Sequence, residues 1–284
     1  MRLGQRGSSI EAQPGHPAAG PRPAISLQRV GKQFRFGRGT TVPALDDLTL
    51  EVEKGQFIAL IGPSGCGKST ALRLIAALEE PTSGTVSIEG AHPREAVRDR
   101  RLGVAFQDHA LLPWLTAWEN IALPFRIAEQ EVDRDRVRGL VELAGLEGFE
   151  QARPKHLSEG MKQRVAIARA LALAPDILLL DEPFGSLDAV TRRRLNLELQ
   201  AIWVEQSVTT VLITHSVDEA VFMADRVYVL SPRPGRVSLI REIPFPRPRD
   251  RALTLAPEFH ALTDDLHAAL DTQAAPPDVV GAVE

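Results

Sequence analysis

The sequence lacks features that mark several large classes of protein. It has one cysteine, Cys66, so no disulfide can form within the chain, and we expect a reducing compartment. No run approaches the ~18 consecutive apolar residues of a membrane-spanning helix, and residues 1–23 lack the apolar centre of a signal peptide. The formal net charge is −4 and no long basic run occurs, so electrostatics gives little support to a nucleic-acid partner. We therefore expect a cytosolic chain that neither crosses a membrane nor binds nucleic acid.

The composition is ordinary for a globular protein. With 284 residues, 44% of them hydrophobic and 25% charged, the chain can form one large domain with a smaller subdomain. Residues 1–23 are rich in Gly, Pro, Ser and Arg and are predicted to be a disordered leader. Residues 24–245 are predicted to form the main domain. Residues 246–284, Pro-rich around one weakly amphipathic segment, are predicted to be a C-terminal tail.

Hydrophobic periodicity predicts an α/β fold. Short β-rich runs occur at residues 25–30, 48–52, 57–62 and 84–90. A helical subdomain is expected over about 108–163, where apolar residues follow a helical spacing. Beyond it, predicted helices at 159–174, 189–206 and 216–224 alternate with predicted strands at 176–181, 208–214 and 226–231. Such alternation favours a mainly parallel sheet covered by helices.

A glycine-rich loop follows the predicted strand 57–62 and precedes a helical run. It fits the pattern G-x-x-x-x-G-K-S, which occurs by chance in roughly one chain in a hundred of this length. Backbone N–H groups of such a loop surround phosphates, Lys68 reaches the β and γ oxygens, and Ser69 binds Mg²⁺. The alternative is a tight turn with a chance lysine. The predicted phosphate-binding residues are Gly62, Pro63, Ser64, Gly65, Cys66, Gly67, Lys68, Ser69 and Thr70.

Two adjacent acids end the apolar run "ILLLDE". Asp181 lies at the carboxyl end of a predicted strand, where ligands of parallel sheets collect, and is expected to bind the metal. Glu182 is then placed to position or deprotonate the attacking water. The alternative is that both acids cap the next turn.

With four further motifs the chain resembles the ATP-binding cassette subunit of a bacterial importer over roughly residues 25–237. These are Gln107 in "VAFQD", the signature "LSEGM" at 157–161, "SLD" at 186–188 and His215 in "ITHS". The resemblance implies a P-loop NTPase (RecA-like) core with a mainly parallel sheet, an antiparallel β subdomain and a helical signature subdomain.

The resemblance also implies a head-to-tail homodimer, in which each ATP lies between one P-loop and the partner's signature loop. Ser158, Gly160 and Asp188 would then contact nucleotide, although Ser158 is also an ordinary N-cap residue. The implied catalytic residues are Glu182, His215, Gln107 and Lys68, and the implied Mg²⁺ ligands are Ser69, Gln107 and Asp181. Phe34 matches the aromatic residue that stacks on adenine, with Phe36 as its rival and core packing as the alternative for both.

The signature loop departs from the family pattern, because Glu159 stands where glycine is most frequent. A carboxylate in the first helical turn is favoured by ~0.3–1 kcal/mol, but next to a triphosphate it is repelled. Our hypothesis is that Glu159 points outward and leaves the site working.

Partners are predicted from the resemblance as well. Trp114 and Trp118 are expected to dock on a permease, with core packing as the alternative. The amino-acid sequence of several stretches is similar to that of the nitrate/sulfonate/taurine importer group. This resemblance implies a small anionic solute, two permease subunits and an extracytoplasmic or periplasmic solute-binding protein. The chain would be peripheral at the cytoplasmic face of the inner membrane. The other readings are a soluble cassette ATPase or a P-loop GTPase or kinase.

Overall fold

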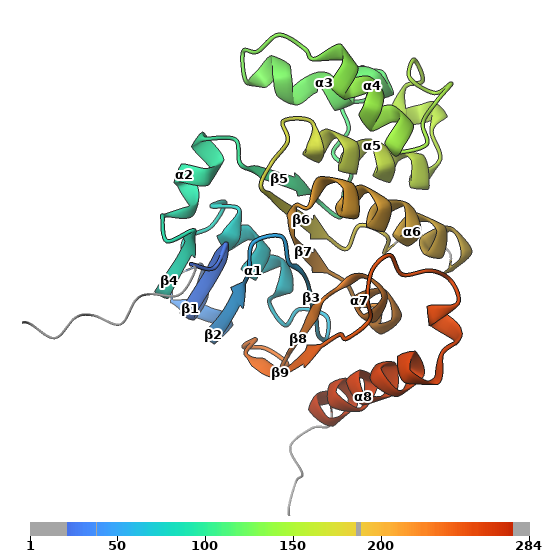
Figure 1. Ribbon diagram of the computed structural model, residues 1–284. Helices are drawn as coiled ribbons and strands as arrows, with labels where there is room; N and C mark the ends of the chain where they lie inside the picture. Colours follow the sequence, from blue (N-terminus) through green and yellow to red (C-terminus); the bar gives the residue numbers. More distant parts are fainter. Residues whose placement is uncertain (1–21, 38, 186–188, 275–284) are drawn as a thin grey trace, which may run out of the picture.

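The computed structural model describes residues 22–37, 39–185 and 189–274, arranged as Figure 1 shows. The strands are β1 (Ile25–Phe36), β2 (Thr40–Val52), β3 (Phe57–Ile61), β4 (Ser83–Ile88), β5 (Leu102–Ala105), β6 (Ile177–Asp181), β7 (Thr209–Ile213), β8 (Arg226–Leu230) and β9 (Val237–Glu242). The helices are α1 (Lys68–Ile75), α2 (Pro93–Arg98), α3 (Ala117–Ile127), α4 (Arg134–Leu143), α5 (Glu159–Leu171), α6 (Ala189–Gln206), α7 (Val217–Met223) and α8 (Pro257–Ala274), with short 3-10 turns η1 (Pro154–His156) and η2 (Leu253–Leu255).

The larger sheet has six strands in the order β5-β6-β7-β3-β8-β9. Neighbouring strands are parallel, apart from β9, which pairs antiparallel with β8. Every residue of β3, β6 and β7 is buried, as in central strands covered on both faces. The edge strand β9 alternates half-buried and exposed residues. The mainly parallel sheet that the sequence predicts is confirmed.

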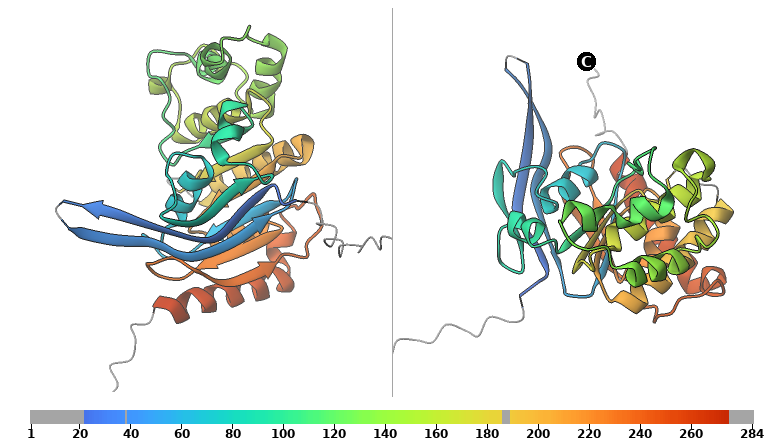
Figure 2. Two further views of the ribbon diagram at one scale, coloured as in Figure 1. Left: turned by 90° about the vertical axis from the view of Figure 1, so that its left-hand side faces the viewer. Right: turned by 90° about the horizontal axis from the view of Figure 1, so that it is seen from above.

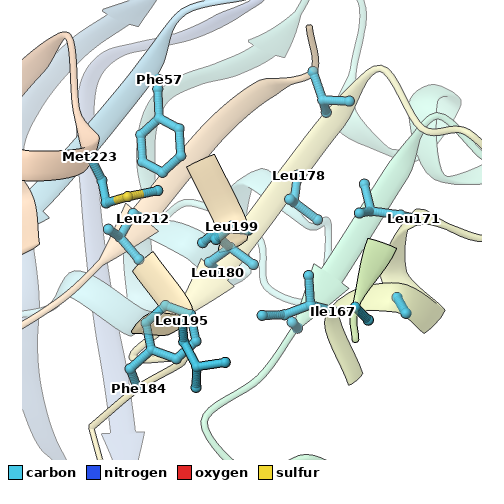
Figure 3. Packing of buried hydrophobic residues seen from close by; sticks show 14 of the residues in the cluster. Phe57, Ile167, Leu171, Leu178, Leu180, Phe184, Leu195, Leu199, Leu212 and Met223 are labelled. Atoms are coloured by element: carbon cyan, nitrogen blue, oxygen red, sulfur yellow. The ribbon is translucent and has the colours of Figure 1, made fainter. Parts of the chain in front are cut away.

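This sheet separates two hydrophobic cores. Because successive side chains of a strand point to opposite faces, Phe57, Ala59 and Ile61 of β3 enter the larger core, while Ile58 and Leu60 enter the smaller one. The larger core is closed by helices α3 to α8, and Figure 3 shows part of it. The smaller core lies against α1 and a second sheet.

The second sheet is antiparallel, with the order β2-β1-β4. It is the antiparallel β subdomain expected from the sequence. Figure 2 shows the ribbon of β1 and β2 projecting beyond the rest of the molecule. β1 continues six residues past the predicted run, since its far half is held by pairing with β2 rather than by burial.

Helices α3, α4 and α5 form a separate lobe at the top of Figure 1. A capping box between Thr116 and Glu119 begins α3. The fully buried Asn120 holds the loop before that helix: its amide nitrogen donates to the carbonyls of Leu112, Leu115 and Thr116, at 3.2, 3.3 and 2.9 Å. The lobe is the helical subdomain expected from the sequence.

The C-terminal segment is bound to the body of the protein. Phe259 and Leu266 of α8 are buried in the larger core, and the Arg249 side chain, 1% exposed, donates to carbonyls at the end of α7. The structure thus differs from the expectation of a tail after residue 245, because the apolar face of α8 finds a partner that composition does not reveal. The predicted leader lies almost entirely outside the described residues. The domain limits themselves stay predictions.

Several short elements were not predicted, among them α2, β5 and β9. None of the helices within the described ranges is long and apolar enough to span a membrane.

Candidate functional site

The loop between β3 and α1 has the form that a phosphate-binding loop requires. Gly67 has a φ of 109°, and a Cβ there would lie 2.7 Å from the Ala44 carbonyl oxygen, so only glycine fits. The next residue begins α1, whose N-terminus therefore faces the loop. The buried Lys68 ammonium donates to the carbonyls of Gly62 at 2.8 Å and Pro63 at 3.1 Å. The loop thus holds a cation at the place where phosphates are expected.

Cys66 is buried in the same loop. Burial raises the pKa of its thiol, against the opposing effect of the nearby Lys68. The side chain is a packing residue here, and its backbone carbonyl lies against Gly235, where an added Cβ would come within 2.1 Å. Ser64 and Gly65 are exposed, while Pro63, Ser69 and Thr70 are half-buried.

Ser69 and Asp181 meet at the carboxyl edge of the six-stranded sheet. The Ser69 hydroxyl donates to Asp181 Oδ1 at 3.0 Å. Burial raises the pKa of Asp181 and the hydrogen bond from Ser69 opposes this. A hydroxyl and a carboxylate oxygen are ligands that suit Mg²⁺, so the donor set that the structure brings together fits the metal.

Glu182 is the centre of a second group. Its Oε2 lies 3.6 Å from His215 Nδ1 and accepts a hydrogen bond from Gln107 Nε2 at 3.4 Å. These three side chains come from the ends of β6, β7 and the loop after β5, which are neighbours in the sheet. The backbone of Glu182 is in the left-handed region, with φ 46°, a conformation that costs a non-glycine residue about 1–2 kcal/mol. Its N–H donates to the Ile213 carbonyl at 2.9 Å, which holds it there.

The signature residues lie on the other lobe, at the start of α5. Ser158 is the N-cap and its hydroxyl accepts from Met161 N–H at 3.3 Å. Gly160 packs against α6, where an added Cβ would lie 3.5 Å from Thr191 and 3.7 Å from Leu195. The capping role and a nucleotide-binding role are compatible, since an N-cap hydroxyl lies beside free helix N–H groups.

The Glu159 carboxylate has two partners within its own chain, Lys162 and His109. Its Oε1 lies 2.6 Å from Lys162 Nζ and its Oε2 lies 3.8 Å from His109 Nε2. The hydrogen bond from Lys162 lowers the pKa of Glu159, so the group is ionised. The side chain is 55% exposed, as the outward-pointing hypothesis requires.

Arg169 of α5 is a residue that sequence reasoning missed. Its guanidinium donates to the carbonyls of His109 at 2.6 Å and Ala110 at 2.7 Å, so it ties the segment after Gln107 to the signature helix. Burial lowers its pKa. The sequence offered only a weak signal, a basic residue among the Ala and Leu of α5.

Three further residues were considered as nucleotide contacts in the sequence analysis, namely Phe34, its rival Phe36, and Asp188. Phe34 is half-buried on β1, with Lys32 Nζ 5.0 Å from its ring centroid. The side chain of Phe36 lies outside the part of the chain that the structure describes. Asp188 lies outside the described residues.

Taken together, a phosphate loop opening into α1, an acid pair at the end of β6 and a helical lobe that presents a capped N-terminus define a P-loop nucleoside triphosphatase of the cassette type.

Comparison with known proteins assigns the family. The ABC transporter family model matches residues 45–185. The aliphatic sulfonates import ATP-binding protein SsuB of Bacillus cereus is 43% identical over 227 residues, which is 80% of this chain and 89% of the relative. The nitrate import ATP-binding protein NrtD of Synechococcus elongatus is 48% identical over 227 residues, 78% of this chain and 82% of the relative.

A solved structure is similar as well. The dimeric post-hydrolysis state of the ATP-binding cassette MJ0796, bound to ADP and Pi, has a TM-score of 0.69 and 32% identity, over 78% of this chain and 99% of that one. The chain belongs to the ABC transporter family as an ATP-binding subunit, and it is an ATPase.

Proposed function

We propose that this chain is the ATP-hydrolysing subunit of an importer that takes up a small anionic solute through partner permeases. The observation that carries the proposal is the convergence of Glu182, His215 and Gln107 beside the Ser69–Asp181 pair. The importer role is supported by the relatives SsuB and NrtD, whose names describe aliphatic sulfonate import and nitrate import.

Each residue of the site has a separate role in the proposed ATP hydrolysis. Lys68 and the backbone N–H groups of the loop would bind the triphosphate. Mg²⁺, held by Ser69, Gln107 and Asp181, would neutralise phosphate charge when bound. Glu182 would orient the attacking water and accept its proton, and His215 would contact the γ-phosphate. Phosphoryl transfer needs this positioning and charge neutralisation rather than a covalent intermediate.

The second half of the site comes from another copy of the chain in this proposal. Ser158 and Gly160 lie on the helical lobe, and a head-to-tail dimer would bring them to the partner's nucleotide as an anion site. That MJ0796 is described as dimeric supports this arrangement. Asp188 would join the same interface.

The permease contact is proposed at the loop before α3. Trp114 is 64% exposed, whereas Trp118 is half-buried and packs against the larger core. A large exposed aromatic side chain on an ordered loop is a typical anchor for a partner. In this proposal the chain is peripheral at the cytoplasmic face of the membrane, and the full system includes two permeases and a solute-binding protein.

The test replaces Trp114 by Glu in cells that contain the partner permeases. We expect membrane attachment to fall at least tenfold while ATP binding is unchanged, since a buried charge weakens a hot spot strongly, and Asn120 still holds the loop. Uptake of labelled alkyl sulfonate, taurine and nitrate, each measured in the same cells, should fall for one of them.

The matched control is Leu255→Glu, at a residue 75% exposed in the C-terminal segment, which should change neither quantity. Full attachment of the Trp114 variant would remove the docking proposal. Unchanged uptake of all three solutes in cells without the chain would favour a soluble cassette ATPase instead.

A separate prediction concerns Glu159. Because its carboxylate is neutralised by Lys162 and points to His109, Glu159→Gly should change the ATP turnover by less than about threefold. It should lower the free energy of unfolding by about 1–2 kcal/mol, because the i,i+3 pair and the acid in the first helical turn are lost and Gly is more flexible than Glu in the unfolded chain. Glu159→Gln, which removes only the charge, is the control. A tenfold rise in turnover for the glycine variant would show that the acid obstructs the partner's nucleotide.

A further inference from the structure

Glu219 is a buried acid that the proposed reaction does not use. It lies in the first turn of α7, and its residue surface is 4% exposed. Burial raises the pKa of this carboxyl to about 7, against the hydrogen bond from Thr214. A group that ionises near neutral pH inside the core calls for an explanation from its contacts.

The first oxygen of Glu219 is bonded to the turn that carries His215. Ser216 N–H donates to Thr214 Oγ1 at 3.0 Å, and the Thr214 hydroxyl donates in turn to Glu219 Oε2. In an ordinary capping box the glutamate would accept directly from Ser216 N–H. Here the Thr214 hydroxyl is inserted between them, so one carboxyl fixes the residues on both sides of His215.

The second oxygen faces α6. Glu219 Oε1 is buried and has no hydrogen-bond partner among the described residues. The same holds for Oδ1 of the buried Asn196. The Asn196 amide nevertheless lies close enough to favour the charged carboxylate. An amide can present either its N–H or its oxygen. The amide N–H can donate to an ionised Glu219, and the amide oxygen can accept from the O–H of a protonated Glu219.

Two charged groups act on Glu219 from neighbouring elements. Arg192 of α6 favours the ionised form, and Glu182, at the end of β6, disfavours it. Glu182 is also the residue that His215 contacts at 3.6 Å. Through Glu182, the charge on Glu219 is therefore coupled electrostatically to the pair formed by Glu182 and His215.

We propose that Glu219 is a positioning residue for His215, and that its ionisation strengthens the Thr214 hydrogen bond which holds His215 against Glu182. This inference rests on the proposed function. A hydroxyl bonded to a carboxylate is held more strongly than one bonded to a neutral acid. Above the pKa of Glu219 the turn is fixed, and below it the turn loosens as Asn196 offers its oxygen to the new O–H group.

The experiment compares ATP turnover of the full chain with that of Glu219→Gln from pH 6 to pH 8. Gln keeps the shape of the protonated acid and cannot ionise. The ratio of wild-type to variant kcat should rise about fivefold across this range, with KM for ATP unchanged. All other residues are the same in the two proteins, so pH effects that arise elsewhere in the chain largely cancel in the ratio. A flat ratio would overturn the proposal.

A second measurement needs no nucleotide. Because the folded pKa lies above that of an unfolded glutamate, the protonated form stabilises the fold, and this stabilisation is lost as the pH rises through about 7. The Tm of the wild type should therefore fall relative to that of Glu219→Gln between pH 5 and pH 8. A Tm difference that does not depend on pH would show that Glu219 does not titrate there, and the proposal would be wrong.

Thr214→Val distinguishes positioning from packing. It removes the hydroxyl but keeps the shape, so kcat should lose its extra pH dependence while the Tm profile still shows the titration of Glu219. Asp218→Asn, at an exposed acid on the same helix, should alter neither profile. A wild type that released no phosphate would contradict the proposed function, whereas the Tm comparison would still decide whether Glu219 titrates.

Discussion

Replacing Glu182 by Gln is expected to reduce ATP turnover at least a hundredfold and to leave ATP binding intact. General-base catalysis contributes about 10²–10⁴-fold, and an amide cannot accept the proton of the attacking water. Lys68, Ser69 and Asp181, which the nucleotide and metal need, are not touched by the change.

The same variant tests the composite site. In gel filtration with light scattering, the Glu182→Gln protein should be a monomer without nucleotide and a dimer with ATP, because bound ATP is no longer consumed. Glu53→Gln, at an exposed acid outside the site, should keep wild-type turnover. Turnover within threefold of wild type would contradict the role of Glu182. A monomer at saturating ATP would mean that closure depends on the permease, or that Glu159 weakens the contact.

The largest effect on stability is expected at Arg249. Its side chain donates to four carbonyls, those of Val221, Phe222, Ala224 and Phe245, and so completes the C-terminus of α7. Burial lowers its pKa to about 10. Arg249→Met fills the space but leaves buried carbonyls unpaired, so the free energy of unfolding should fall by about 3–5 kcal/mol.

Urea denaturation followed by circular dichroism measures this change. Arg251→Met, two residues away and exposed, is the matched control and should alter the stability by less than about 0.5 kcal/mol. If the Arg249 variant were as stable as the control, water would have to replace the lost donors, and the C-terminal segment would not be fastened through this residue.

The motifs that carry the proposed catalytic residues were predictable because each is local in sequence. A glycine loop between a strand and a helix has few other uses, and an acid at the end of an apolar strand lies at the edge of the sheet in any parallel arrangement. The prediction that Ser69 and Asp181 come together follows from these rules, although the two residues are 112 positions apart.

Contacts between distant segments were not predictable in the same way. Nothing local distinguishes Arg169 from other basic residues of α5, and its role exists because the loop after β5 passes beside it. The C-terminal segment looked like a tail, since its Pro-rich start conceals a helix whose Phe259 is buried.

By itself the sequence determined the α/β class, the phosphate loop, the acid pair at 181–182 and the membership that these motifs indicate, because each depends on residues within one strand–turn–helix unit. Only the tertiary structure decided that Trp114 is exposed while Trp118 is packed, that Glu159 is neutralised by Lys162, and that Glu219 reaches His215 through Thr214. The exposure of a side chain, its ion pairs and the pKa of a buried acid depend on which side chains come into contact in the folded protein. Sequence spacing does not specify these contacts.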